Sequence, residues 1–380
     1  MSPDLLTTGP RGRRLCLAVA CTLDDELAEA ARQRAFVLDD GSTMHRFVAA
    51  EAGDPPLTQA EIDAYLAAEA ARPVPTVADV ARLLESVTVP SGVPDQGLLT
   101  FALQTAVDAA MYWQPPAGED VLAGKPELDG GLARIATWLA PHAPDWWRAP
   151  MAPEQWTIGW WGHDPREVTQ SVTGWREATV AAEERAAAQR RENQVEYPKE
   201  GWSPTPGLRP ADIDAPIGGI WWSFPDGVSS TRAVGGVPLG LDLTEDTDVD
   251  GVSVAPAQGP ENPRVLEIDT PRVWVDLCRA HPLDVTASRR HDWYRVTGRD
   301  GDWVIPDWAA VAEDYDAVHL TTAAYLAGAT RSLEVDQRLA TMIAGRGPDA
   351  TVWLTPVQVG TPRAWSFDRE ADRAVRWSAS

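Results

Sequence analysis

Lysine is almost missing from this chain. Of its 33 basic residues only Lys125 and Lys199 are lysines, so arginine supplies nearly all of the positive charge. Acidic residues number 56, which gives a formal net charge of -23. Duplex nucleic acid and anionic membranes both attract proteins with a concentrated basic surface. The composition therefore argues against either of them as a ligand.

Cysteine and long apolar runs are scarce too. The three cysteines, Cys16, Cys21 and Cys278, form no CxxC pair, and an odd number without a framework is typical of a reducing compartment. Residues 11–21 resemble a signal peptide, but their apolar run is short and acidic residues follow at once. No run reaches the roughly 20 apolar residues of a membrane span. We expect a soluble, cytoplasmic protein, and the oligomeric state stays open.

The common catalytic motifs are also missing. The chain has no P-loop, GxGxxG, GxSxG, HExxH or paired CxxC, which argues against most kinases, classical dehydrogenases, α/β-hydrolases and zinc proteases. Residues 246–251 match the first half of a calcium loop, but Ala257 stands where a bidentate glutamate is required. A solvated acidic turn is the better interpretation, and no metal is expected.

Hydrophobic residues make up 44% of the 380 positions, enough for a large core. The patterns predict an α+β fold, with a mostly helical N-terminal region followed by a mixed α+β domain with short strands. We expect a helical region at 1–150, a strand, a long helix and a proline-rich linker at 151–216, and an α+β domain with a possible ligand cleft at 217–380. The first ten residues are expected to be disordered.

Periodicity, caps and proline positions place the individual elements. Thr58 with Glu61 and Thr76 with Asp79 form capping-box patterns. Asp164 is expected to cap a long helix. Further helices are expected at 23–36, 95–113, 128–139, 271–280, 308–314 and 336–344, and strands at 155–161, 217–223, 239–243, 252–255, 265–268, 317–321 and 351–354.

Residues 302–326 form the clearest unit, with a strand end, a helix that Asp307 can cap and a second apolar strand. His319 is the one titratable group in that apolar strand, and Asp316 precedes it. A histidine can act as general acid or base near neutral pH. A structural histidine with satisfied hydrogen bonds is the more common alternative.

A second group of chemically useful residues begins with Trp222 and Ser223 and continues with Ser230, Thr231 and Arg232. An aromatic ring can stack on a flat ligand while hydroxyls and a guanidinium hold its polar groups. A buried strand followed by a hydroxyl-rich turn explains the same residues without a ligand. Among the 18 tryptophans, scattered positions favour core packing.

Two segments, VLEIDTPRVWVDLCRAHP and DWAAVAEDYDAVHLT, resemble the C-terminal parts of uncharacterised bacterial proteins. Some of these look distantly like the ADP-ribosyltransferase fold, a split α+β sandwich that binds NAD in a cleft. The resemblance covers residues 217–354, with IWWSF and SSTR in the places of that fold's aromatic-serine and Ser-Thr-Ser elements. The chain departs from the pattern in having no unambiguous Glu-x-Glu turn.

The resemblance implies an NAD-binding ADP-ribosyltransferase-like protein of unknown target. Trp222 would stack on nicotinamide, with Ser223, Ser230 and Thr231 shaping the site. Arg232 would hold the pyrophosphate. Asp316 or His319 would orient the ribose or activate an acceptor.

Two other functions fit the composition. An acidic, Trp-rich surface is equally expected of a non-catalytic module that binds a protein partner. Carbohydrate binding by exposed tryptophan faces is a third possibility.

Overall fold

The computed structural model describes residues 1–39, 58–70, 74–167, 171–192, 212–214, 218–246, 249–368 and 377–379, and its fold is α+β. The chain divides into two compact units. Unit 1 comprises Met1–Ala109 and Gln114–Ala143, and unit 2 comprises Ala110–Trp113 and Pro144–Ser380. Most of the predicted linker at 197–216 lies outside the described residues. The described part of the chain contains no helix with the length and apolar character needed to span a bilayer.

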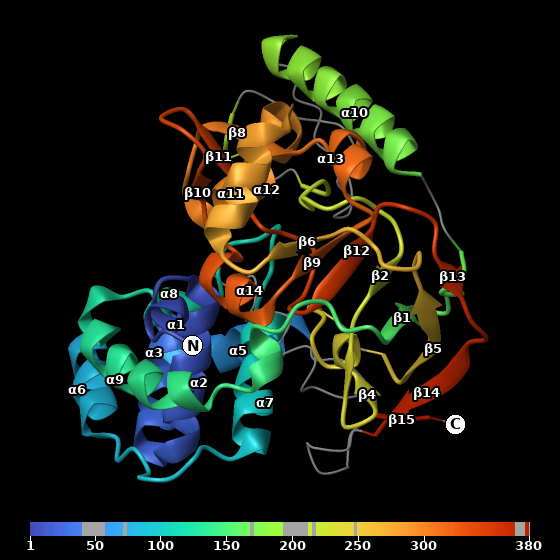
Figure 1. Cartoon of the computed structure of the whole chain (residues 1–380). Coiled ribbons are helices and arrows are strands. Elements are labelled where there is room, and N and C mark those ends of the chain that lie inside the picture. The colour runs from blue at the N-terminus through green and yellow to red at the C-terminus, as the bar shows by residue number, and fades with distance from the viewer. Residues whose placement is uncertain are drawn as a thin grey trace. The chain divides into compact units, whose positions relative to one another are not determined.

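Unit 1 is helical, as predicted, and appears in blue to teal in Figure 1. The prediction of disorder in the first ten residues is wrong, because Asp4–Thr7 form a helix in which Leu6 is fully buried, and Pro10 starts the next helix. Arg11 in this helix pairs with buried Asp120 and donates to the Ala106 carbonyl at 2.9 Å. Its helices are α1 (Asp4–Thr7), α2 (Pro10–Leu23), α3 (Asp25–Leu38), α5 (Gln59–Ala70), α6 (Val77–Ser86), α7 (Gln96–Asp108), α8 (Gly118–Ala123) and α9 (Asp129–Leu139), with 3-10 turns η1 (Pro126–Leu128) and η2 (Ala140–His142).

The described residues of unit 2 form three sheets and a hairpin. One sheet has the order β1-β5-β14-β15 with β13 beside β5, a second β2-β12-β9-β6, and a third β10-β11-β8-β7. Their strands are β1 (Gln155–Gly159), β2 (Ser229–Ser230), β5 (Gly251–Gln258), β6 (Val265–Ile268), β7 (Pro282–Asp284), β8 (Asp302–Pro306), β9 (Ala317–Leu320), β10 (Leu333–Glu334), β11 (Leu339–Thr341), β12 (Ala350–Trp353), β13 (Gln358–Val359), β14 (Arg363–Phe367) and β15 (Trp377–Ala379); the hairpin is β3 (Ala233–Val234) and β4 (Val237–Pro238).

The first two sheets are joined where β1 meets the end of β2. The backbone of Trp156 donates to Thr231 O at 2.8 Å, and Thr231 N donates to Trp156 O at 2.9 Å. This bridge fixes β1 beside the end of β2.

The helices of unit 2 pack on one another and on these sheets. α10 (Val172–Glu192) lies along α12 (Thr286–Thr297) and α13 (Trp308–Asp314), as Figure 1 shows. Glu183 of α10 accepts the first backbone N–H groups of α12, from Ala287 at 2.7 Å and Ser288 at 2.8 Å, which satisfies donors that a helix start leaves unpaired. The remaining elements are α11 (Pro271–Ala280), α14 (Thr322–Gly328), η3 (Asp145–Trp147) and η4 (Leu239–Leu241).

Several predicted elements of unit 2 differ from those observed. The helix expected at 336–344 is a turn followed by β11, because Leu339 and Ala340 pair with β8. Residues 239–243 form η4 and a turn, and residues 218–223 have no regular structure. The segment after Asp164 is a turn, and α10 begins at Val172. Sheet pairing and loop closure overrode local propensity at these positions.

Candidate ligand pocket and buried ion network

A row of polar side chains crosses the second sheet. Glu267, His319, Thr351 and Ser230 stand at paired positions on β6, β9, β12 and β2. His319 and Thr351 are completely buried, and Ser230 is almost completely buried. We call the row, together with Asp349 and Arg232, the polar ladder.

The ladder is held by direct contacts. His319 Nδ1 lies 2.5 Å from Glu267 Oε2, and its Nε2 lies 3.2 Å from Asp349 Oδ1. Arg232 Nε donates to the same Asp349 oxygen at 2.6 Å. With His319 protonated, two cations and two carboxylates balance, which lowers the cost of burying them.

Burial lowers the pKa of His319, but hydrogen bonds to Asp349 and Glu267 together with their charges outweigh burial and raise that pKa overall.

The ladder also fixes the segment before β1. Arg232 donates to Pro150 O at 2.7 Å, and Met151 N donates to Glu267 Oε1 at 2.9 Å. This network therefore anchors the entry to β1.

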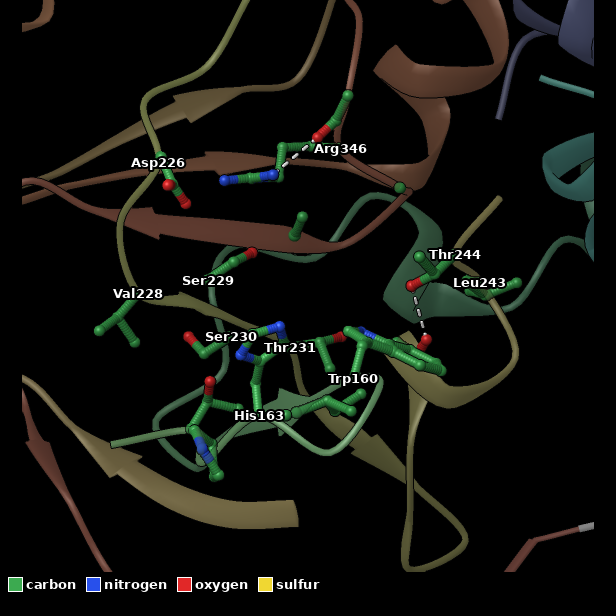
Figure 2. Close-up of a pocket in the computed structure, with 18 of the residues that line it drawn as sticks. Trp160, His163, Asp226, Val228, Ser229, Ser230, Thr231, Leu243, Thr244 and Arg346 are labelled. Carbon is green, nitrogen blue, oxygen red and sulfur yellow. Dashed lines mark hydrogen bonds between the residues drawn. The ribbon is translucent and has the colours of Figure 1, made fainter. Parts of the chain in front are cut away.

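A hollow of about 780 Å³ adjoins the ladder. We call it the large hollow. Its walls come from β1 and the turn after it, from β2, and from the turn before β12. Figure 2 shows Ser229, Ser230 and Thr231 along one wall, with Arg346 and Asp226 on one side and Trp160 and His163 on the other. Its aromatic residues are Trp113, Trp156, Trp160, Trp161 and Trp221.

A second hollow, of about 420 Å³, lies between α10 and residues 220–226. We call it the small hollow. Trp175 and Ala182 of α10 form one wall, and Trp222 and Phe224 form another. Pockets of a few hundred Å³ with mostly apolar walls are typical small-molecule sites. The two hollows share four lining residues, namely Trp221, Asp226, Gly345 and Arg346.

Arg346 is the cation common to both hollows. It donates to the Gly345 carbonyl and to the Pro225 carbonyl, each at 2.8 Å, while its buried Nε has no hydrogen-bond partner among the described residues. No carboxylate in the described part of the chain lies within ion-pair distance of it. Burial lowers the pKa of the Arg346 guanidinium, and the charges of Glu245 and Asp226 act in the opposite direction. In Figure 2 its guanidinium extends toward Asp226.

The site residues predicted from sequence are distributed among different environments. Ser230 and Thr231 line the large hollow, and Trp222 lines the small one. Ser223 is buried, where its hydroxyl donates to Ala344 O at 3.0 Å and accepts from Ala344 N at 2.8 Å. Arg232 pairs with Asp349 inside the ladder. The structure thus brings three of the five predicted ligand-contact residues to the hollows.

The two predicted catalytic residues line neither hollow. Both nitrogens of His319 contact carboxylates of the ladder. Asp316 pairs with Arg264, whose backbone N–H also donates to it at 2.8 Å, and hydrogen bonds from Arg264 lower the pKa of Asp316. Both side chains therefore have internal partners.

Sequence reasoning missed Arg346, Asp349 and Glu267. One signal for Asp349 was available. It lies two positions before Thr351, the first residue of an expected strand, and residues two apart point to the same face of a strand. Arg346 between two glycines gave a weaker signal. Within the described ranges, no group of three or more His, Cys, Asp and Glu side chains is placed to hold a metal ion.

Comparison of the chain with protein-family models, with curated protein sequences and with solved structures gives no match.

Proposed function

We propose that unit 2 binds NAD across the two hollows and transfers ADP-ribose to an acceptor. The observation that carries this proposal is the position of Arg346, a guanidinium that forms no ion pair with a carboxylate of the described residues and that lines both hollows. NAD has the corresponding form, with two ring systems joined by an anionic diphosphate. Arg346 would donate to the diphosphate, and charge-assisted hydrogen bonds of this kind are among the strongest.

The walls suit the two ring systems. Trp221 lines both hollows, and Trp156 and Trp160 add further indole faces in the large one. Aromatic side chains stack favourably on flat rings, and Ser229 and Thr244 bring hydroxyl-bearing side chains to the large hollow. The lining thus offers stacking for the rings and hydrogen bonds for the sugars.

The charge of the large hollow bears on selectivity. Arg346 is the only arginine or lysine among its lining residues in the described part of the chain, and Asp226 and Glu245 lie nearby. These carboxylates favour the positively charged nicotinamide ring of NAD⁺ and disfavour a further phosphate. We therefore expect NAD⁺ to bind more tightly than NADH or NADP⁺.

The same carboxylates suit the transfer reaction. When the bond between ribose and nicotinamide breaks, its electron pair leaves with nicotinamide and positive charge develops on the ribose ring. A nearby carboxylate stabilises that charge, as in glycoside hydrolysis. The acceptor's oxygen or nitrogen then forms the new bond to the ribose and releases its proton to bulk water. Asp226 and Glu245 are the candidates for the carboxylate that stabilises the positive charge on the ribose.

Isothermal titration with NAD⁺ tests the proposal. Replacing Arg346→Gln removes a charge-assisted interaction of about 1.5–3 kcal/mol, so affinity should fall roughly 10- to 100-fold. The control is Arg272→Gln, since Arg272 makes only an exposed pair with Asp276. Mass spectrometry of lysate proteins incubated with the enzyme and NAD⁺ should show added ADP-ribose.

The competing interpretation is a non-catalytic module that binds a protein partner. It predicts no heat on titration with NAD⁺, no ADP-ribose on any protein and no dependence on Arg346. Such a result would sink the proposal.

A further inference from the structure

The turn after β1 presents one indole ring to solvent at the edge of the large hollow. Trp161 is 66% exposed, whereas Trp147, Trp274 and Trp308 are buried. Its φ is +51° and that of Gly162 is +80°, and a non-glycine residue with positive φ is uncommon and strained. The turn is tight, with His163 N donating to Trp160 O at 2.9 Å. Backbone geometry therefore holds Trp161 outward.

The surroundings of Trp161 are acidic. Arg166 in the same turn pairs with Asp164, so it contributes little net positive charge. Arg346 also lines the hollow. The carboxylates that line the large hollow are those of Asp164, Glu167, Asp226, Glu245 and Asp246. We call Trp161, Asp164 and Glu167, which all come from the segment after β1, the acidic rim, and the other three carboxylates add to the negative charge of the hollow.

We propose that the acidic rim docks a basic segment of a polypeptide through an arginine side chain. A guanidinium stacks on an indole face by a cation–π contact, for which tryptophan is the best partner, and its planar fork also pairs with carboxylates. Charge complementarity selects this partner over an acidic one, because like charges at a contact oppose association. The inference rests on the proposed function in one respect: the docked segment would carry the group that accepts ADP-ribose from NAD.

Peptide binding is measured without NAD, by fluorescence anisotropy with labelled peptides of equal length. An arginine-rich peptide should bind more tightly than a lysine-rich one, and its affinity should fall as salt rises. A glutamate-rich peptide should not bind. Trp161→Ala should weaken the arginine peptide about two- to five-fold, the loss of an exposed cation–π contact.

Matched controls separate the rim from the rest of the surface. Val234→Ala removes another exposed apolar side chain, 40% exposed in the β3–β4 hairpin, and should leave peptide affinity unchanged. Glu167→Gln should weaken binding, whereas Glu261→Gln, exposed and outside both hollows, should not. Equal binding of the glutamate-rich peptide, or no change in Trp161→Ala, would overturn the inference.

Calorimetry keeps this inference distinct from the proposed function. Trp161→Ala that loses peptide affinity but still binds NAD⁺ supports the docking role. If the protein binds the peptide but gives no heat with NAD⁺, the docking inference is supported and the proposed binding of NAD is rejected.

Discussion

Asp349 is the residue on which the polar ladder depends. It is 1% exposed, has φ +61°, and contacts Arg232, His319 and Thr231. Sequence alone showed His319 as the only titratable group in an apolar strand. It could not show the partners, because Asp349 and Glu267 lie 30 and 52 positions away and their approach depends on strand register.

Replacing Asp349→Asn is expected to destabilise the protein by about 3–5 kcal/mol, because it leaves Arg232 and His319 buried without their shared counter-charge. Asparagine tolerates the left-handed backbone, so the change reports charge and not strain. The control Asp316→Asn breaks a surface pair with Arg264 and should cost about 0–1 kcal/mol. Urea unfolding measures both, and equal losses would contradict a special role for Asp349.

Local signals located some elements of unit 2 well and others poorly. The strands expected at 265–268, 317–321 and 351–354 are β6, β9 and β12 to within a residue, because each is a short apolar run with few alternatives. Residues 336–344 also had a helix-like pattern, yet pairing with β8 and β10 makes part of them a strand. Sequence predicted a ligand cleft at 217–380 and three residues that line the hollows, but not the rest of the lining, since the walls come from segments far apart in sequence.

Gly345 lines both hollows. Its φ is +84°, and a Cβ there would lie 2.9 Å from the Cβ of Trp222 and 3.1 Å from a ring carbon of Trp221. Gly345→Ala should therefore lose about 1–2 kcal/mol from backbone strain and a further roughly 1–3 kcal/mol from crowding. NAD⁺ affinity should fall as well, because the indoles that line the hollows must move.

Gly235→Ala is the matched control, because Gly235 has φ +61° but open space around its Cβ position. It should show the backbone cost alone and unchanged NAD⁺ affinity. Equal stability losses in the two variants, measured by urea unfolding, would mean that the indoles do not restrict this position.

At the scale of the whole molecule, pH dependence connects charge to stability. The pKa of His319 is raised above its ordinary 6.5 in the folded protein. A raised folded-state pKa gives stabilisation that is complete below the unfolded pKa and is lost as pH rises through the folded pKa. The loss begins near pH 6.5 because the unfolded chain releases this proton first.

The free energy of unfolding should therefore fall as pH is raised from about 6.5 through the folded pKa of His319. Urea titrations at a series of pH values measure the slope. His319→Gln should be less stable near pH 6 and should flatten the slope. Exposed His163→Asn should keep it, and a slope that persists in His319→Gln would assign the effect to other groups.

Trp221 gives the molecule an optical property. Its ring lies 5.5 Å from Tyr112 in a stacked arrangement, 4.8 Å from Trp113 and 5.6 Å from Trp222, and it lines both hollows. Transitions of rings this close couple to one another, so the group absorbs circularly polarised ultraviolet light as one chromophore. Filling either hollow perturbs a member of that chromophore, and near-ultraviolet circular dichroism follows occupancy without any attached label.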